Sequence, residues 1–149
     1  MGLIGSASGA NESSLVGTWA TSSSLGELVD RGSGTSIQSA YTGQAYRFRQ
    51  DGTYWYLIVG SGTLSSGAAV QEGDYKVNGS LLTLRSKTES WTPNPNKPGQ
   101  PAAYRNKQII EVTRYELDLT DPNTLHLTEV PYGTRSTFHR TRASQQAPP

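Results

Sequence analysis

Two histidines, His126 and His139, are the side chains of this sequence best suited to metal binding or proton transfer near neutral pH. They lie on neighbouring apolar-alternating segments that we expect to pair as a β-hairpin around Tyr132-Gly133. Counting outward from that turn places the two histidines opposite each other on the solvent side. Such a pair would suit a metal or a haem. Glu129 is expected on the opposite face of its strand from His126, so it cannot act as a third ligand. We therefore expect two solvated histidines, with no metal and no cofactor.

Other catalytic patterns are weak or missing. The chain has no cysteine, which excludes thiolate chemistry, and no serine lies in a Gly-X-Ser-X-Gly elbow. Glu116 and Asp118 alternate with Arg114 along one strand face, the pattern of a solvated outer surface with mixed charge. A glycosidase-like carboxylate pair remains open on spacing alone, but nothing in the sequence selects one.

Aromatic residues are the more informative group, because tyrosine combines an apolar ring with a hydroxyl that can orient a bound molecule. They gather in the first two thirds of the chain, on segments of alternating β-strand pattern. We expect one face of those segments to line the inside of the fold. The candidate ligand-binding residues are Tyr46, Phe48, Trp55, Tyr75, Leu82, Leu84, Tyr115 and Leu117.

The strands that would hold these residues are short and separated by turn signals. We expect eight, over 15–23, 44–50, 53–59, 70–77, 80–91, 104–119, 124–130 and 134–141. Asp51-Gly52 and Asn78-Gly79 each predict a two-residue hairpin turn. Those turns would place Phe48 opposite Trp55, and Tyr75 opposite Leu82.

Two longer segments separate strands. Residues 24–43 have the capping-box spacing of a short helical turn over 25–31 and have the length of a lid. Residues 92–103 contain four prolines and predict a stiff external loop.

Composition and charge narrow the binding partners, the domain organisation and the compartment that we expect for this protein. A net charge of +1 with no basic stripe argues against nucleic-acid binding, and no apolar run approaches the roughly 18 residues of a membrane span. We expect a disordered leader over 1–14, one domain over 15–142 and a disordered tail over 143–149. The leader favours a periplasmic or secreted protein after signal removal, whereas Met1 argues the other way.

Several motifs resemble those of the lipocalins and other calycins, and in particular small bacterial lipocalin-like domains. Leu15-Val16-Gly17-Thr18-Trp19 is similar to the Gly-X-Trp signature that opens their first strand. The motifs that follow are Tyr46-X-Phe48-X-X-Asp51-Gly52-Thr53-Tyr54, Gly73-X-Tyr75-X-Val77-X-Gly79 and Leu82-X-Leu84.

The resemblance covers 15–142 and implies an eight-stranded up-and-down antiparallel barrel, an all-β fold. It also implies that a basic residue of the last strand packs across Trp19 and closes the barrel. That residue would be Arg140, with Arg142 as the second choice, and a cation–π contact there contributes about 0.5–2 kcal/mol.

Three functions follow from such a barrel. The first is non-enzymatic binding of a small, largely apolar molecule in the barrel mouth. The second is a cyclase or isomerase that shapes its substrate without an acid–base pair, which a tight cavity with buried tyrosine hydroxyls would favour. The third is a structural or assembly domain whose barrel is filled by its own side chains. The sequence leaves the ligand and the oligomeric state open.

Overall fold

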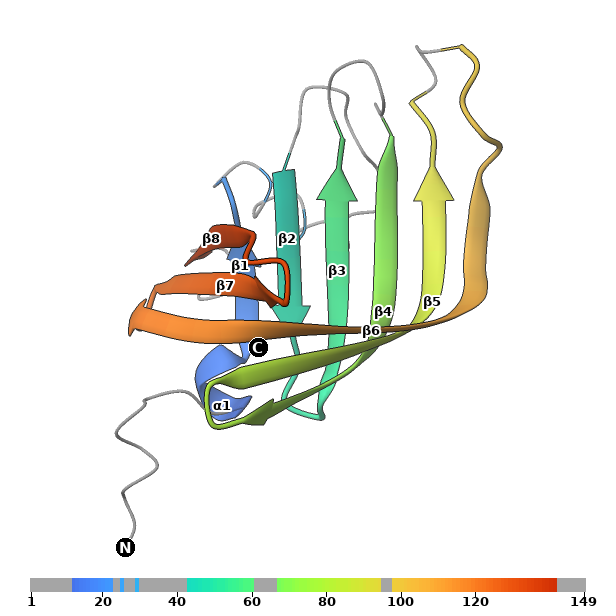
Figure 1. The fold of residues 1–149 in the computed structure, drawn as a ribbon. Helices are drawn as coiled ribbons and strands as arrows, with labels where there is room; N and C mark the ends of the chain where they lie inside the picture. Colours follow the sequence, from blue (N-terminus) through green and yellow to red (C-terminus); the bar gives the residue numbers. More distant parts are fainter. Residues whose placement is uncertain are drawn as a thin grey trace, which may run out of the picture.

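Eight antiparallel strands follow one another around a closed barrel, each paired with the next in sequence and the last with the first (Figure 1). The computed structural model describes residues 12–22, Leu25, Val29, 43–60, 67–94 and 98–141. Its elements are α1 (Glu12–Leu15), β1 (Gly17–Ala20), β2 (Gly43–Phe48), β3 (Thr53–Val59), β4 (Ala68–Asn78), β5 (Leu81–Thr92), β6 (Tyr104–Asp121), β7 (Thr124–Val130) and β8 (Arg135–Arg140). The predicted all-β, eight-stranded up-and-down barrel is confirmed.

Helix α1 sits at one end of the barrel and begins at Glu12, inside the segment expected to be a polar leader (Figure 1). Leu15 is fully buried, and the indole Nε1 of Trp19 donates a hydrogen bond to its carbonyl oxygen at 2.8 Å. Residues 1–11 and 142–149, which hold the rest of the expected leader, the expected tail and Arg142, lie outside the described residues. Of the helical turn expected over 25–31, Leu25 and Val29 are described, and both are helical.

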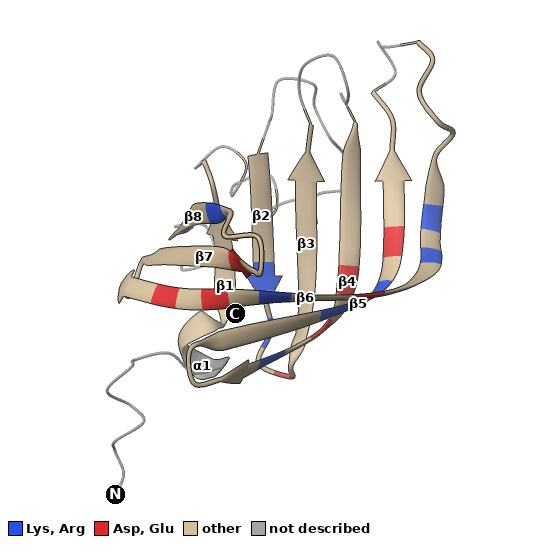
Figure 2. Ribbon diagram, viewed as in Figure 1, with Lys and Arg blue, Asp and Glu red and all other residues tan. Residues whose placement is uncertain are grey.

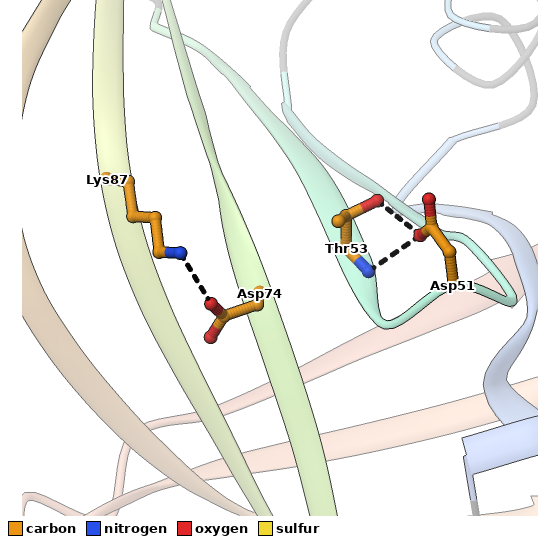
Figure 3. Close-up of polar contacts among 4 residues, drawn as sticks. All are labelled: Asp51, Thr53, Asp74 and Lys87. Carbon is orange, nitrogen blue, oxygen red and sulfur yellow. Dashed lines mark hydrogen bonds and ion pairs between the residues drawn. The ribbon is translucent and has the colours of Figure 1, made fainter.

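The first hairpin turns over three residues, not two. Arg49 N donates to the Thr53 carbonyl at 2.9 Å, which leaves Gln50, Asp51 and Gly52 as the loop. Asp51 Oδ1 accepts hydrogen bonds from the backbone N and the Oγ1 of Thr53, at 3.0 and 2.6 Å (Figure 3). Gly52 takes a φ of 89°, as the last residue of such a loop requires. The predicted pairing of Phe48 with Trp55 is therefore wrong.

This shift of one residue reverses both faces of β3, because side chains alternate along a strand. Phe48 pairs with Tyr54 and Tyr46 with Tyr56. Tyr54 thus takes the inward position expected for Trp55, and Tyr56 lies inward beside Tyr46.

Two other hairpins differ from expectation by two positions, which keeps each side chain on its predicted face. In the second, Asn78 pairs with Leu81, so Gly79 and Ser80 form the loop and Tyr75 lies opposite Leu84. Gly79 has a φ of 65°, which matches the first central position of a type II′ turn.

In the last hairpin the loop spans 130–133. Glu129 N donates to Thr134 O and Gly133 N donates to Glu129 O, at 2.8 and 2.7 Å. Leu125 therefore pairs with Phe138.

The barrel interior is filled by its own side chains, which we call the plug. Its rings contact closely: Tyr46 stacks on Phe48 with centroids 5.3 Å apart, and Phe48 meets Tyr75 edge-on at 4.9 Å. Such aromatic pairs add to the free energy of burial. The plug contains Leu15, Trp19, Tyr46, Phe48, Tyr54, Tyr75, Leu82, Leu84, Leu117, Leu125, Leu127 and Phe138.

A second buried group, the outer cluster, lies on the opposite face of β2–β4. It consists of Ala20, Leu25, Val29, Ala45, Trp55, Leu57, Val59 and Ala68. Leu25 and Val29 are both fully buried there. The guanidinium of Arg47 donates to the Val29 carbonyl at 2.9 Å, so this part of 24–43 docks on the barrel wall.

Strands β4 and β5 bend where a β-bulge interrupts their pairing, between Glu72 and Gly73. A Cβ added at Gly73 would lie 1.8 Å from the carbonyl oxygen of Arg85. Glycine is therefore required for this close approach of the two backbones.

Charges of both signs are spread over the strands (Figure 2). In the described part of the chain no helix has the length and apolar character needed to cross a bilayer.

Candidate binding site at the barrel mouth

One end of the barrel has a taller wall than the rest. Strands β2–β6 extend upward in Figure 1, whereas β7 pairs with β6 only from Arg114 onward. The inward side chains of this extension form cross-strand rows, which we call the upper wall. The row nearest the plug is Phe48, Tyr54, Gly73, Ser86 and Glu111, the next is Tyr46, Tyr56, Gln71, Glu89 and Lys107, and the outermost is Gln44, Ile58, Ala69, Trp91 and Tyr104.

A continuous hydrogen-bonded chain crosses four strands of the upper wall. The Tyr54 hydroxyl bonds to Ser86 Oγ, which donates to Gln71 Oε1 at 3.1 Å. Gln71 Nε2 in turn donates to Glu89 Oε1 at 3.0 Å, and Glu89 Oε2 accepts a hydrogen bond from the Tyr104 hydroxyl. This series of hydrogen bonds thus runs from the buried plug to the half-buried outer row.

The side-chain amide of Gln71 also contacts a second carboxylate, that of Glu111. Gln71 Nε2 also lies 3.4 Å from Oε1 of Glu111, so carboxylates of β5 and β6 meet one donor on β4. Next to this group, Tyr56 donates to Gln44 Oε1 at 3.0 Å.

Strict alternation along each strand would not place Glu89 or Tyr104 on the inner face, because bulges interrupt the alternation there. Ser86 pairs with Gly73 and Thr88 with Glu72, so Lys87 is an extra residue in β5. As a result Ser86 and Glu89, three positions apart, share the inner face, which strict alternation forbids. On β6 a register shift lies next to Asn106, which has a φ of 54°.

Burial raises the pKa of several tyrosines in this region above the ordinary value. It raises the pKa of Tyr54 to about 12, against the ordinary 10.0, and raises the pKa of Tyr56 further. Burial likewise raises the pKa of Tyr46 and of Tyr115, whose hydroxyls are hydrogen-bonded to each other. The pKa of Tyr104 is raised because its hydroxyl bonds to the Glu89 carboxylate. At neutral pH these hydroxyls are protonated and take part in hydrogen bonds.

The predicted lining residues divide into three groups. Tyr46, Phe48, Tyr75, Leu82, Leu84 and Leu117 are at most 5% exposed and belong to the plug. Tyr115 is half-buried and packs against the plug. Trp55 lies in the outer cluster, so the prediction that it faces the barrel interior is wrong, for the turn-length reason given above.

Trp19 and Arg140 pair across the β1–β8 seam. The guanidinium carbon of Arg140 lies 4.2 Å from the centroid of the Trp19 ring. The side chain also donates to three backbone carbonyls, those of Ser14, Val16 and Pro122.

The two histidines are not opposite each other, so that predicted register is wrong. His126 pairs with Thr137, to whose hydroxyl its Nδ1 is hydrogen-bonded at 2.9 Å, whereas His139 pairs with Thr124. Within the described residues no group of three or more acidic or imidazole side chains is placed to hold a metal ion.

The outer surface carries its own charges. An open depression of about 320 Å³ on β3–β5 is lined by Arg49, Thr53, Tyr54, Glu72, Gly73, Asp74, Lys87 and Thr88. Lys87 Nζ lies 2.9 Å from Asp74 Oδ2 there (Figure 3), with both side chains well exposed. Exposed pairs of this kind contribute about 0–1 kcal/mol, and nothing about this one selects a ligand.

Comparison with protein-family models, curated proteins and solved structures returned no match.

Proposed function

We propose that this protein binds a small, largely apolar molecule in the barrel mouth, without catalysing a reaction. The observation that carries the proposal is the hydrogen-bonded chain on the upper wall, from Tyr54 through Gln71 to Tyr104. Binding sites in barrel mouths commonly combine apolar walls with a few convergent polar groups.

The plug determines how deep such a ligand reaches. Its residues are almost fully buried against one another, so the ligand lies above them, on the upper wall. Trp91, Tyr104 and Ile58 offer apolar surface in the outer row, and none of them is fully buried. One row deeper, the Gln71 amide would donate a hydrogen bond to a polar end of the molecule or accept one from it, and the Glu89 carboxylate would accept one.

We further propose that the barrel is of the lipocalin-like, calycin kind. The support is local: Gly17 and Trp19 open β1, and the Arg140 guanidinium covers both.

A filled structural barrel is the second candidate function. The observation in its favour is the plug, which occupies the lower interior with the protein's own side chains. It differs from the first candidate in one testable respect, because a structural barrel retains and binds no small molecule.

Native mass spectrometry of the purified protein, repeated after denaturation, is the first test. We expect an excess mass that disappears on denaturation. The second test is a fluorescence titration with a neutral naphthyl ketone dye, read by energy transfer from tryptophan. Because Trp91 lies on the upper wall and Trp55 on the outer face, Trp91→Phe should reduce the transfer far more than Trp55→Phe.

Variants of two glutamines provide a matched comparison. Gln71→Leu removes the central amide of the upper wall, whereas Gln108→Leu makes the same change at an exposed outer position. We expect about tenfold weaker dye binding for the first and no change for the second, since losing one buried hydrogen-bond partner costs on the order of 1.4 kcal/mol. An apo mass together with no saturable dye binding would support the structural barrel instead.

A further inference from the structure

The upper part of β6 has one edge that carries no strand. β6 pairs with β5 from Tyr104 to Glu116, but β7 joins its other edge only from Arg114. Among the described residues, 107–113 therefore have no strand beyond them, and this stretch lies at the right of Figure 1. Unpaired backbone groups along such an edge are a template for another strand.

This edge is also unusually apolar for an exposed one. Ile110 is 95% exposed and Val112 is 46% exposed, the former being the most exposed large apolar side chain described. Within this edge β6 shifts register against β5 between Gln108 and Glu111. The irregular backbone at Asn106, with its positive φ, ends the edge on one side. Arg114, already paired to β7, ends it on the other.

The charge pattern of this edge is self-complementary. In an antiparallel pair of identical strands related by a two-fold axis, the residue numbers of facing partners have a constant sum. With Ile109 on the axis, Lys107 of each copy faces Glu111 of the other, so the pairing contains two opposite-charge pairs. With Ile110 on the axis, Glu111 would instead face Ile109 and Lys107 would face Thr113. Opposite charges that face each other stabilise a strand pair, so the charge pattern favours the register with Ile109 on the two-fold axis.

We infer that two copies of this chain associate edge to edge through residues 107–111, antiparallel, with Ile109 at the two-fold axis. The association makes one continuous sheet from the two upper walls and places Ile110 of each copy beside Gln108 of the other. It does not depend on the proposed binding function, because no small molecule takes part in it.

Charge reversal tests both the association and its register. We expect sedimentation velocity to show a concentration-dependent dimer with a Kd tighter than about 1 mM. Lys107→Glu and Glu111→Lys should each weaken it at least about tenfold, because each places like charges opposite one another. The double variant, Lys107→Glu with Glu111→Lys, should restore the wild-type Kd.

Glu116→Lys is the matched control, since it reverses an exposed charge of β6 where both edges are paired, and it should leave the Kd unchanged. Circular dichroism would verify that every variant keeps the barrel. A wild-type protein that stays monomeric up to about 1 mM overturns the inference. A dimer that survives both single reversals, or is not restored in the double variant, overturns it equally.

Discussion

The guanidinium of Arg140, on the last strand, covers the indole of Trp19, on the first, at 4.2 Å from the ring centroid. Its three nitrogens donate to the carbonyls of Val16, Ser14 and Pro122, at 2.8, 2.9 and 3.0 Å. A Cβ added at Gly17 would lie 2.5 Å from Arg140 Nη1, so this glycine gives the guanidinium its space. One side chain thus joins β1, α1 and the β6–β7 turn.

Arg140→Ala should lower the free energy of unfolding by about 3 kcal/mol, because it removes three charge-assisted hydrogen bonds and the stacking on Trp19. Arg140→Lys should cost about half as much, since a lysine keeps the charge but loses the planar fork. Urea unfolding measures both. Arg135→Ala, at an exposed arginine 4.0 Å from Asp118, is the control and should change stability by under about 0.5 kcal/mol. Equal losses at the two arginines would contradict this role of Arg140.

Gly73→Ala should destabilise the barrel by about 3 kcal/mol or more. The added Cβ would meet the Arg85 carbonyl, a backbone group that cannot move without opening the bulge. Gly79→Ala is the comparison: its φ is positive, but no other atom lies within 4 Å of the added Cβ. Gly79→Ala should lower the free energy of unfolding by only about 1 kcal/mol, the cost of placing an alanine in the left-handed backbone conformation. Chemical unfolding should therefore show a larger loss of unfolding free energy for Gly73→Ala than for Gly79→Ala. The opposite order would contradict the close approach of the β4 and β5 backbones.

Stability should fall at alkaline pH. Burial raises the pKa of Tyr54 to about 12, whereas the unfolded chain has the ordinary value of 10.0. The stabilisation from the neutral hydroxyl is therefore complete below pH 10 and is lost as the pH rises toward 12. Each such tyrosine contributes up to about 1.4 kcal/mol per pH unit in that window.

Urea unfolding over a pH series, with tyrosinate absorbance as a second readout, measures this loss. Tyr54→Phe should make the fall shallower, because one of the titrating groups is gone. A free energy of unfolding that stays constant from pH 10 to pH 12 would contradict the burial of these hydroxyls.

Leu25→Ala should loosen the cover over the outer cluster and cost about 2–3 kcal/mol, since Leu25 is fully buried there. Water would then reach Trp55, and its fluorescence emission should shift to longer wavelength. In a Trp55→Phe background the same leucine substitution should produce no such shift. A red shift that persists in that background would come from Trp19 or Trp91 and would contradict this assignment.

The number and order of the strands could be predicted from the sequence, because β-branched and aromatic runs separated by turn residues report local structure directly. The inward direction of Tyr46, Phe48, Tyr75, Leu82 and Leu84 could be predicted for the same reason. The faces of β3 could not, because Asp51-Gly52 suits both a two-residue and a three-residue loop. The choice depends on the hydrogen bonds from Thr53 to the Asp51 carboxylate.

The sequence by itself thus determined eight antiparallel strands joined in sequence, since hydrophobic alternation and turn chemistry act between residues close in the chain. The pairing of β1 with β8, which closes the barrel, joins residues far apart in the chain and came only with the tertiary structure. Only the tertiary structure decided which polar side chains meet at the mouth. Gln71, Ser86, Glu89 and Tyr104 come from three strands, and bulges at Lys87 and near Asn106 bring them onto one face. Bulges depend on how neighbouring strands bend around a common interior, a property of the closed barrel and not of any one segment.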